Sequence, residues 1–344
     1  MIDIKLLEQL CLCNGISGDE GNVRNLIINE IKDCADDIKT DNLGNLIVFK
    51  KGKKSAKSKL MVSAHMDEVG LMVTDITSDG YLKFDEVGGI DRRVLPGKRV
   101  CVGRNGLNGV IGVKPIHLTN GDEKTAVPKM NDMYIDIGAE SREDALKYVN
   151  YGDGINFEGD FKINGKTVVT KALDDRFGCY VLINLIKSEP EYDMYFTFVV
   201  QEEVGLRGAR SAAFTVNPDF ALVIESTTAA DVAEVDVSHQ VCNLSKGATV
   251  TVMDRATVYD KEMISAAFEL AEKNNIAVQY KRAVAGGNDS GAIHQSRGGV
   301  RTLAVSLPSR YIHAPSTAAN LDDCESILKL AKVLSDYIAG GNLA

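Results

Sequence analysis

The sequence contains no tryptophan, no pair of cysteines spaced C-x-x-C and no uncharged apolar run of about 18 residues. The missing apolar run excludes a membrane-spanning helix, and the start Met-Ile-Asp-Ile-Lys lacks the basic leader and hydrophobic core of a signal peptide. The seven cysteines are an odd, scattered set, which argues against a disulfide framework and against a cysteine-type zinc site. The sequence therefore predicts a cytoplasmic protein with reduced thiols.

Basic residues are too few to balance the acidic ones. The chain has 39 Lys and Arg against 48 Asp and Glu, a formal net charge of −9. This charge repels nucleic acid and anionic membranes, so neither is predicted as a partner. A small or peptidic ligand is the expectation that remains.

The order of apolar patterns predicts an α/β fold interrupted by an insert. Buried-strand patterns alternate with segments of helical spacing, whereas residues 69–163 consist mostly of short β runs separated by glycines. We therefore predict a catalytic α/β domain, 1–68 and 164–344, and an inserted small β-barrel or sandwich domain, 69–163. Ser17 and Glu20 have the spacing of a capping box, which predicts a helix starting at residue 21.

Imidazole and carboxylate groups follow the predicted core strands. The strand at 59–64 is followed by His65 and Asp67, and the strand at 194–200 by Glu202 and Glu203. The strand at 220–224 is expected to end at Glu225, and the one at 302–307 leads to the loop that contains His313. Active sites of open α/β sheets lie beyond the carboxyl ends of the strands. Nitrogen and oxygen donors without thiolates are the ligands of catalytic zinc, cobalt or manganese.

A site with two metals also needs a carboxylate that bridges them. Asp174 and Asp175 follow the apolar Leu173 at the start of a predicted helix and are the natural source. Two plainer interpretations stay open from these residues alone. Asp174 could simply cap its helix, and Glu202 and Glu203 could be two loop acids on the surface.

The other candidate residues have weaker patterns. His117 lies in the β insert, and His239 and His294 are in polar contexts, so all three are predicted to be structural or loop histidines. The segment Gly286–Gly291 could hold a phosphate, but it lacks the lysine and spacing of a P-loop. A tight loop that caps a helix near the site is the preferred interpretation.

Five motifs, in order, resemble those of a known enzyme family. They are His65-x-Asp67, Leu173-Asp174-Asp175-Arg176, Glu202-Glu203-Val204-Gly205, Ile224-Glu225-Ser226-Thr227-Thr228 and Tyr311-Ile312-His313-Ala314-Pro315. They resemble the dinuclear metallo-aminopeptidases that include glutamyl, deblocking and tetrahedral, dodecameric aminopeptidases, some of which are labelled cellulase M. The resemblance covers essentially the whole chain. It implies a zinc-peptidase-like catalytic domain with a mixed sheet flanked by helices, and a homo-oligomer, a dodecamer built from dimers, held partly through the β insert.

The same resemblance implies a role for each site residue. Asp174 bridges two divalent ions, zinc first with cobalt or manganese as alternatives; His65 and Glu225 complete one metal site, and Glu203 and His313 the other. Glu202 is the general base for a metal-bridging hydroxide, and Asp67 orients His65. The implied activity is removal of N-terminal residues from short peptides.

The chain departs from the family pattern at three places. Many relatives have aspartate where Glu225 stands, serine and glutamate where Ala314 and Thr317 stand, and Gly-Thr-Asp where this chain has Gly287-Asn288-Asp289.

Two other functions compete with this interpretation. A glycosidase needs two carboxyl groups flanking a sugar, usually on an aromatic platform, and the chain has no tryptophan. A non-enzymatic metal-binding scaffold would not need Glu202, which no ligand count requires.

Overall fold

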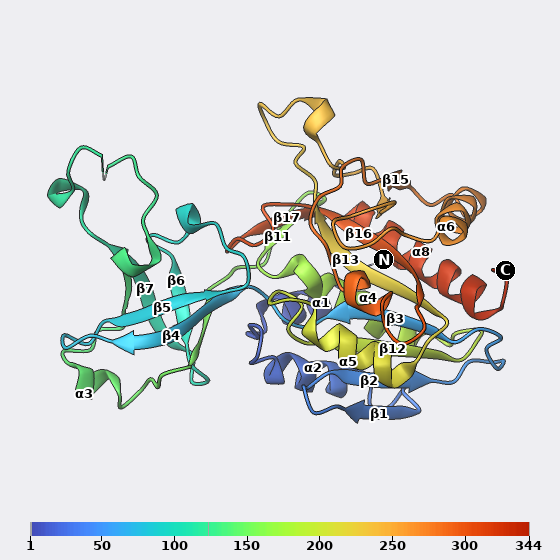
Figure 1. Ribbon diagram of the computed structural model, residues 1–344, viewed down its shortest axis with the longest axis horizontal. Helices are drawn as coiled ribbons and strands as arrows, with labels where there is room; N and C mark the ends of the chain where they lie inside the picture. The colour runs from blue at the N-terminus through green and yellow to red at the C-terminus, as the bar shows by residue number, and fades with distance from the viewer. Residues whose placement is uncertain (1, 123, 344) are drawn as a thin grey trace.

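The computed structural model describes residues 2–122 and 124–343. It has a large body, in which helices cover a sheet, and a smaller β barrel beside it (Figure 1). No helix in the described ranges is long and apolar enough to cross a membrane.

The large body is built on an 11-stranded mixed sheet with the order β1-β2-β12-β3-β13-β16-β17-β11-β10 and with β14 and β15 beside β16. The pairs β12–β3, β3–β13 and β13–β16 are parallel, whereas the outer pairs along this path are antiparallel. The strands are β1 (Asp37–Thr40), β2 (Leu46–Lys50), β3 (Leu60–His65), β10 (Lys162–Asn164), β11 (Thr167–Thr170), β12 (Met194–Val199), β13 (Phe220–Thr228), β14 (Ala248–Val250), β15 (Val278–Tyr280), β16 (Arg301–Arg310) and β17 (Thr317–Asn320).

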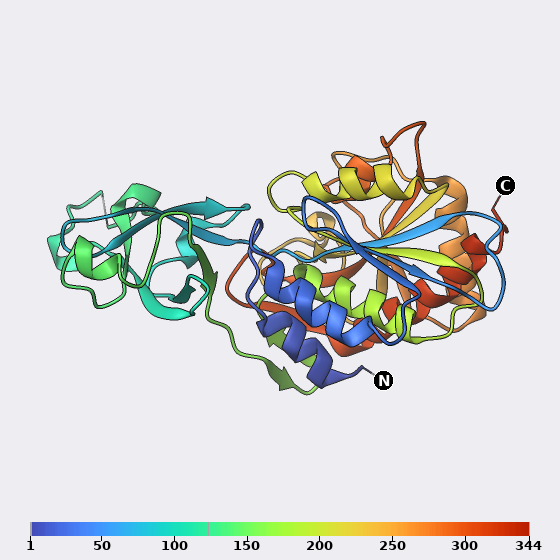
Figure 2. The same cartoon turned by 90° about the horizontal axis from the view of Figure 1, so that it is seen from below.

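Helices pack on both faces of this sheet (Figure 2). Because both faces are covered, the central strands are continuous apolar runs; all six residues of β3 are buried. α4 and α8 pack on one face together with α1 and α2, while α5 and α7 cover the other. The helices are α1 (Ile4–Leu12), α2 (Gly21–Ile31), α4 (Leu173–Lys187), α5 (Arg207–Val216), α6 (Lys261–Lys273), α7 (Ser290–Ile293) and α8 (Leu321–Ala339), with a 3-10 turn η4 (Val237–His239).

The insert is a closed antiparallel barrel with the strand order β4-β5-β8-β7-β6-β9. Its buried side chains form a hydrophobic cluster separate from that of the large body. The fold class predicted from the sequence is confirmed, and the insert is a barrel rather than a sandwich. The barrel elements are β4 (Gly70–Ile76), β5 (Leu82–Val87), η1 (Arg92–Val94), β6 (Arg99–Val102), β7 (Leu107–Val113), η2 (Ile116–Leu118), η3 (Met130–Asp132), β8 (Met133–Asp136), α3 (Arg142–Ala145) and β9 (Gly154–Phe157).

The predicted capping box at α2 is wrong. The helix does begin at Gly21, but no side chain caps it. The Ser17 hydroxyl instead donates to Asp67 at 2.6 Å, and Glu20 accepts from the backbone N–H groups of Gly18 and Gln201. The polar contacts of the neighbouring site therefore outweigh the local cap.

Candidate functional site

The parallel strands bring the predicted residues to one edge of the sheet. His65 is the last residue of β3, and Glu202 and Glu203 follow β12 after a short turn. Asp174 lies at the start of α4, and His313 lies in the loop between β16 and β17. The five predicted metal ligands and Glu202 therefore meet at one place, near the carboxyl ends of the parallel strands.

Glu225 does not end its strand as predicted. β13 continues to Thr228, and Glu225 pairs with Ser306 of β16 in the middle of the sheet. The reason is that the parallel pairing of β13 with β16 extends three residues further, to Thr228 and Ser309. Glu225 thus reaches the site from within a strand, and its side chain is 7% exposed.

Two groups of possible metal ligands share Asp174. One consists of His65, Asp174 and Glu225, and the other of Asp174, Glu203 and His313; in each, the donor atoms lie within 4.8 Å of one another. Asp174 Oδ1 is 3.4 Å from His65 Nε2, while its Oδ2 is 3.4 Å from His313 Nε2. One carboxylate thus presents one oxygen to each group, which is the arrangement that a bridging ligand needs.

The second histidine of this arrangement also contacts Glu203. His313 Nε2 lies 3.3 Å from Glu203 Oε2, and His65 Nε2 lies 3.4 Å from Glu225 Oε1. A third possible group, His65 with Glu202 and Glu203, overlaps the first two. Glu202 therefore lies close to the positions where the two groups could hold metal ions.

The negative charge of the site carboxylates is not balanced by positively charged groups nearby. Burial raises the pKa of Glu203 to about 8, with Asp174 adding to it, and burial raises the pKa of Glu225 to about 7. Burial likewise raises the pKa of Glu202 well above its usual range. Asp174 Oδ1 and Glu225 Oε2 are buried without any hydrogen-bond partner. Such orphaned anionic oxygens are costly, and divalent cations would satisfy them.

The same negative charges also raise the pKa values of the two histidines. Burial lowers the pKa of His313, but the neighbouring Asp174 and Glu203 outweigh it and raise the pKa to about 9. For His65 the same balance raises the pKa well above its usual value, with Glu225 the main opposing charge. Imidazole nitrogens and carboxylate oxygens without thiolates suit zinc, cobalt or manganese, so the residues present fit a metal centre.

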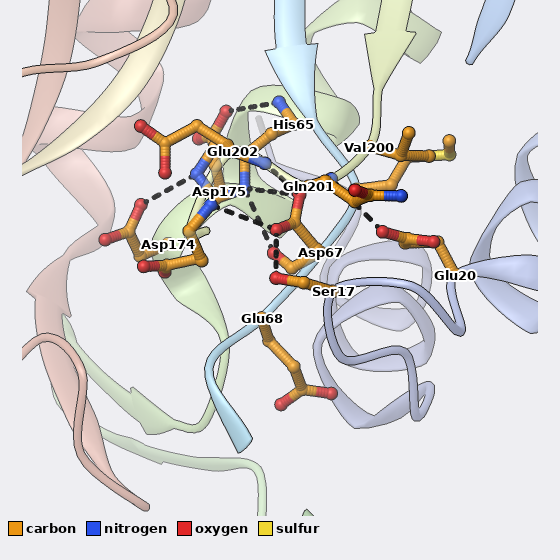
Figure 3. A network of polar contacts seen from close by, with 12 residues as sticks. Ser17, Glu20, His65, Asp67, Glu68, Asp174, Asp175, Val200, Gln201 and Glu202 are labelled. Atoms are coloured by element: carbon orange, nitrogen blue, oxygen red, sulfur yellow. Dashed lines mark hydrogen bonds and ion pairs between the residues drawn. The ribbon is translucent and has the colours of Figure 1, made fainter. Parts of the chain in front are cut away.

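Asp67 lies at the centre of a hydrogen-bond network (Figure 3). Its backbone carbonyl is 3.0 Å from Nδ1 of His65; because a carbonyl can only accept, Nδ1 carries the proton and Nε2 is left to face Asp174 and Glu225. Its carboxylate accepts from the N–H groups of Glu202 and Glu203, both at 3.1 Å, and from Ser17. Asp67 thus contacts His65 through its backbone carbonyl, and its carboxylate holds the turn that carries both glutamates.

The sequence interpretation missed one acid of this site. Asp289 is completely buried, and neither of its carboxylate oxygens has a hydrogen-bond partner. Burial raises its pKa well above the usual range; His65 opposes this effect, and the charges of Glu225, Asp67 and Glu203 add to it. The sequence interpretation of Gly286–Gly291 as a tight, helix-capping loop near the site assigns no role to this aspartate.

The remaining histidines lie outside these groups, as predicted. His117 and His239 are exposed, and the ring of His294 contacts the carbonyl of Ser290 at 2.7 Å. In the part of the chain that the structure describes, none of the three belongs to a possible metal-ligand group.

A cavity of about 290 Å³ opens beside the cluster. His65, Asp174, Glu202, Glu225 and His313 form part of its wall. A ligand in this cavity would touch both groups of metal ligands and Glu202 at once. A partly buried cluster of histidines and carboxylates beside such a cavity, at the edge of a mixed sheet, is typical of a metallohydrolase.

Comparison with known proteins gives the particular family. The family profile described as M42 glutamyl aminopeptidase matches residues 44–330, and the chain belongs to this family. It is therefore a metal-dependent aminopeptidase, a hydrolase, and the resemblance read from its motifs is confirmed. A protein of Acetivibrio thermocellus named for aminopeptidase activity is 43% identical over 327 residues, 94% of this chain and 96% of that protein. A lysyl aminopeptidase of Pyrococcus furiosus is 34% identical, with 98% of each chain covered.

Solved structures agree over the whole fold. A TET aminopeptidase from the archaeon Thaumarchaeota archaeon SCGC AB-539-E09 has a TM-score of 0.92 and 33% identity, covering 96% of this chain and 95% of that one. The TET1 peptidase of Pyrococcus horikoshii has a TM-score of 0.85 and 40% identity, covering 96% and 98%; it is described as assembling into a tetrahedron or a large octahedral shell.

Proposed function

We propose that this chain is a dinuclear aminopeptidase that removes residues from the amino end of short peptides. The observation that carries the proposal is the position of Asp174, whose two oxygens each face a different histidine at 3.4 Å. His65 and Glu225 would hold one divalent ion, and Glu203 and His313 the other. Zinc is the first candidate, with cobalt and manganese as alternatives.

Glu202 has the position and protonation behaviour of a general base. Two divalent ions, when bound, polarise the substrate carbonyl and make a water acidic enough to attack it at neutral pH. Glu202 lies in the cavity wall, and burial raises its pKa well above the usual range of a carboxyl group, which makes its carboxylate a stronger base toward water. It accepts the proton of the attacking water and then delivers it to the departing amine. Asp67 keeps Glu202 in place through the backbone N–H.

A digestion of matched peptides tests this function. We expect the metal-loaded protein to shorten a free pentapeptide by one residue at a time, because a free α-amine can bind at the cluster, and to leave the N-acetylated peptide intact. Mass spectrometry of the products at successive times records the ladder, with carboxymethylcellulose as a second control substrate. Equal cleavage of the acetylated peptide, or release of sugar that disappears in Glu202→Gln, would contradict the assignment.

We also propose that the chain forms a homo-oligomer, a dodecamer built from dimers, partly through the insert 69–163. The barrel exposes large apolar side chains, with Ile116 at 69%, Leu118 at 58% and Val127 at 50% exposure. Exposed apolar groups gathered on one small domain indicate a surface that another chain covers. A closed assembly would also keep folded proteins away from the site and admit only short peptides.

Light scattering tests the assembly. We expect the wild-type protein to have the mass of twelve chains, and the double substitution Ile116→Asp with Leu118→Asp to give smaller species, because two charges would be buried in the interface. Val258→Asp is the matched control, since Val258 is 75% exposed but lies on the large body. A monomeric wild type at micromolar concentration would rule the proposal out.

A further inference from the structure

The barrel comes close to two of the possible metal ligands. β5 pairs antiparallel with β4, and the end of β5 lies opposite the first residue of β4, where the chain has just left the body. β5 therefore ends on the side of the barrel that faces the body (Figure 1). Gly88 and Gly89 follow it and form a glycine bend, which lies next to Glu203 and His313.

The glycine bend leaves no space for a side chain at Gly88. A Cβ atom at this position would lie 2.9 Å from Cγ1 of Val69 and 3.2 Å from Cβ of Glu203. Gly88 also has a φ of +82°, a left-handed conformation that residues with a Cβ atom adopt only at a cost. A Cβ atom at Gly89 would make an ordinary contact, 3.8 Å, with Nδ1 of His313. The bend therefore lies against both side chains.

The two groups of possible metal ligands differ in what surrounds them. They are the His65 group, with His65, Asp174 and Glu225, and the His313 group, with Asp174, Glu203 and His313. The whole His313 group lines a cavity of about 10 Å³, room for about one water molecule, together with Val69 and Phe157 of the insert. The His65 group lines the larger cavity, whose described lining residues all belong to the body. The barrel thus encloses the His313 group.

A packed joint holds the barrel in this position. The buried side chain of Ile16 fits between two glycines of the barrel: a Cβ atom at Gly70 would overlap it, and one at Gly154 would lie 3.1 Å from its Cδ1. The buried Asn156 of β9 accepts a hydrogen bond from the backbone N–H of Gly15 at 3.1 Å. These contacts fix the glycine bend relative to the body.

We propose that the glycine bend is a positioning element of the metal site, which sets how tightly the His313 group holds its ion. This inference rests on the proposed dinuclear function and adds the barrel to the parts of the chain that shape the site. Glu203 is also held by Asp67, which accepts from its backbone N–H at 3.1 Å. The bend and Asp67 together restrict the Glu203 side chain before an ion arrives. A ligand that is ordered in advance loses less entropy on binding, so the ion is bound more tightly.

Gly88→Ala tests the proposal through metal binding. The added methyl group is too close to Val69 and Glu203 for both to keep their positions. We expect the Kd of one of two zinc ions to rise by about 10- to 100-fold, the usual effect of changing groups that orient metal ligands, while the other Kd changes little. Titration of the metal-free protein in competition with a zinc indicator measures both values. Glu203→Gln should weaken the same ion and so identifies it.

Gly152→Ala is the matched control. Gly152 also belongs to the insert and has nearly the same conformation, with a φ of +83°. A Cβ atom there would meet no described atom within 4 Å. The control therefore imposes the same backbone strain without a contact at the site, and both zinc ions should bind to it as to the wild type. Equal weakening of the same ion in Gly152→Ala and Gly88→Ala would overturn the proposal.

Activity at excess zinc separates a weakened ion from a general structural defect. The ligands themselves are unchanged in Gly88→Ala, so its kcat should return toward that of the wild type once both ions are bound. A loss of kcat that persists with two ions bound would overturn the assigned role.

Hydrogen exchange on the wild-type protein gives a test that needs no folded variant. Binding and conformation are linked in both directions, so the ion of the His313 group should slow exchange in the segment 85–91. Mass spectrometry compares the protein with no, one and two zinc ions per chain, and the segment 148–154 serves as the internal control. No added protection of 85–91 at either step, or equal protection of both segments, would contradict the proposal.

The zinc titration also separates a failure of this inference from a failure of the proposed function. A wild type that binds one ion per chain would show the dinuclear proposal to be wrong, and this inference with it. If the wild type binds two ions and needs both for activity, while Gly88→Ala keeps both Kd values, the proposed function stands and this inference alone is overturned.

Discussion

Replacing Glu202 with glutamine is expected to lower kcat by about 10²–10⁴-fold while the protein keeps its fold and its metal ions. The amide has nearly the same shape as the carboxylate but cannot take a proton from water. The backbone N–H of residue 202 would still donate to Asp67, so the turn should stay in place. On the same preparation, steady-state rates measure kcat, metal analysis counts the bound ions, and circular dichroism checks the fold.

Glu203→Gln is the matched control for this experiment, because it changes the adjacent carboxylate. Glu203 lies 3.3 Å from His313 and shares a ligand group with Asp174. Its substitution should therefore lower metal occupancy, which Glu202→Gln should not. If Glu202→Gln turned over peptides at nearly the wild-type rate, the base would have to be another group, and Asp67 would be the first to test.

Removal of the divalent ions is expected to abolish turnover completely, and return of zinc, cobalt or manganese to restore it. Without ions, one buried oxygen of Asp174, Oδ1, and one of Glu225, Oε2, have no hydrogen-bond partner, so the site should also be less stable. A ligand at about 1,000 times its Kd stabilises the folded state by about 4 kcal/mol, so loading should raise Tm. Dialysis against a chelator, followed by rate and melting measurements before and after reloading, provides the test. Full turnover by a protein shown to be free of metal would contradict the account.

The parts of the fold that were predictable from the sequence are those with strong local patterns. The core strands β3, β12 and β16 are long apolar runs because helices cover both faces of the sheet. His65, Glu202 and His313 were predictable because they follow such runs closely, where the chain must leave the sheet. The barrel was predictable as an insert because its short, glycine-separated strands differ from the surrounding alternation.

The features that the sequence did not predict depend on contacts between distant residues. Ser17 and Glu20 have the spacing of a local cap, but each bonds to a distant residue instead. Ser17 donates to Asp67, 50 residues away, and Glu20 accepts from the backbone N–H of Gln201, 181 residues away. Glu225 lies inside its strand because the pairing partner β16 continues, which no local pattern reveals. Asp289 is an ordinary charged residue in a glycine-rich turn of the sequence, and only the folded chain brings it close to the charges of the cluster.

Titration of metal-free protein with zinc tests the central claim, that one aspartate joins two metal sites, most directly. Activity and bound zinc are measured at each addition, with bound metal counted per chain. The account predicts that activity reaches its plateau only when two ions are bound per chain, and that Asp174→Asn retains fewer than two. Full activity with a single ion per chain, or two ions bound by Asp174→Asn as tightly as by the wild type, would contradict it.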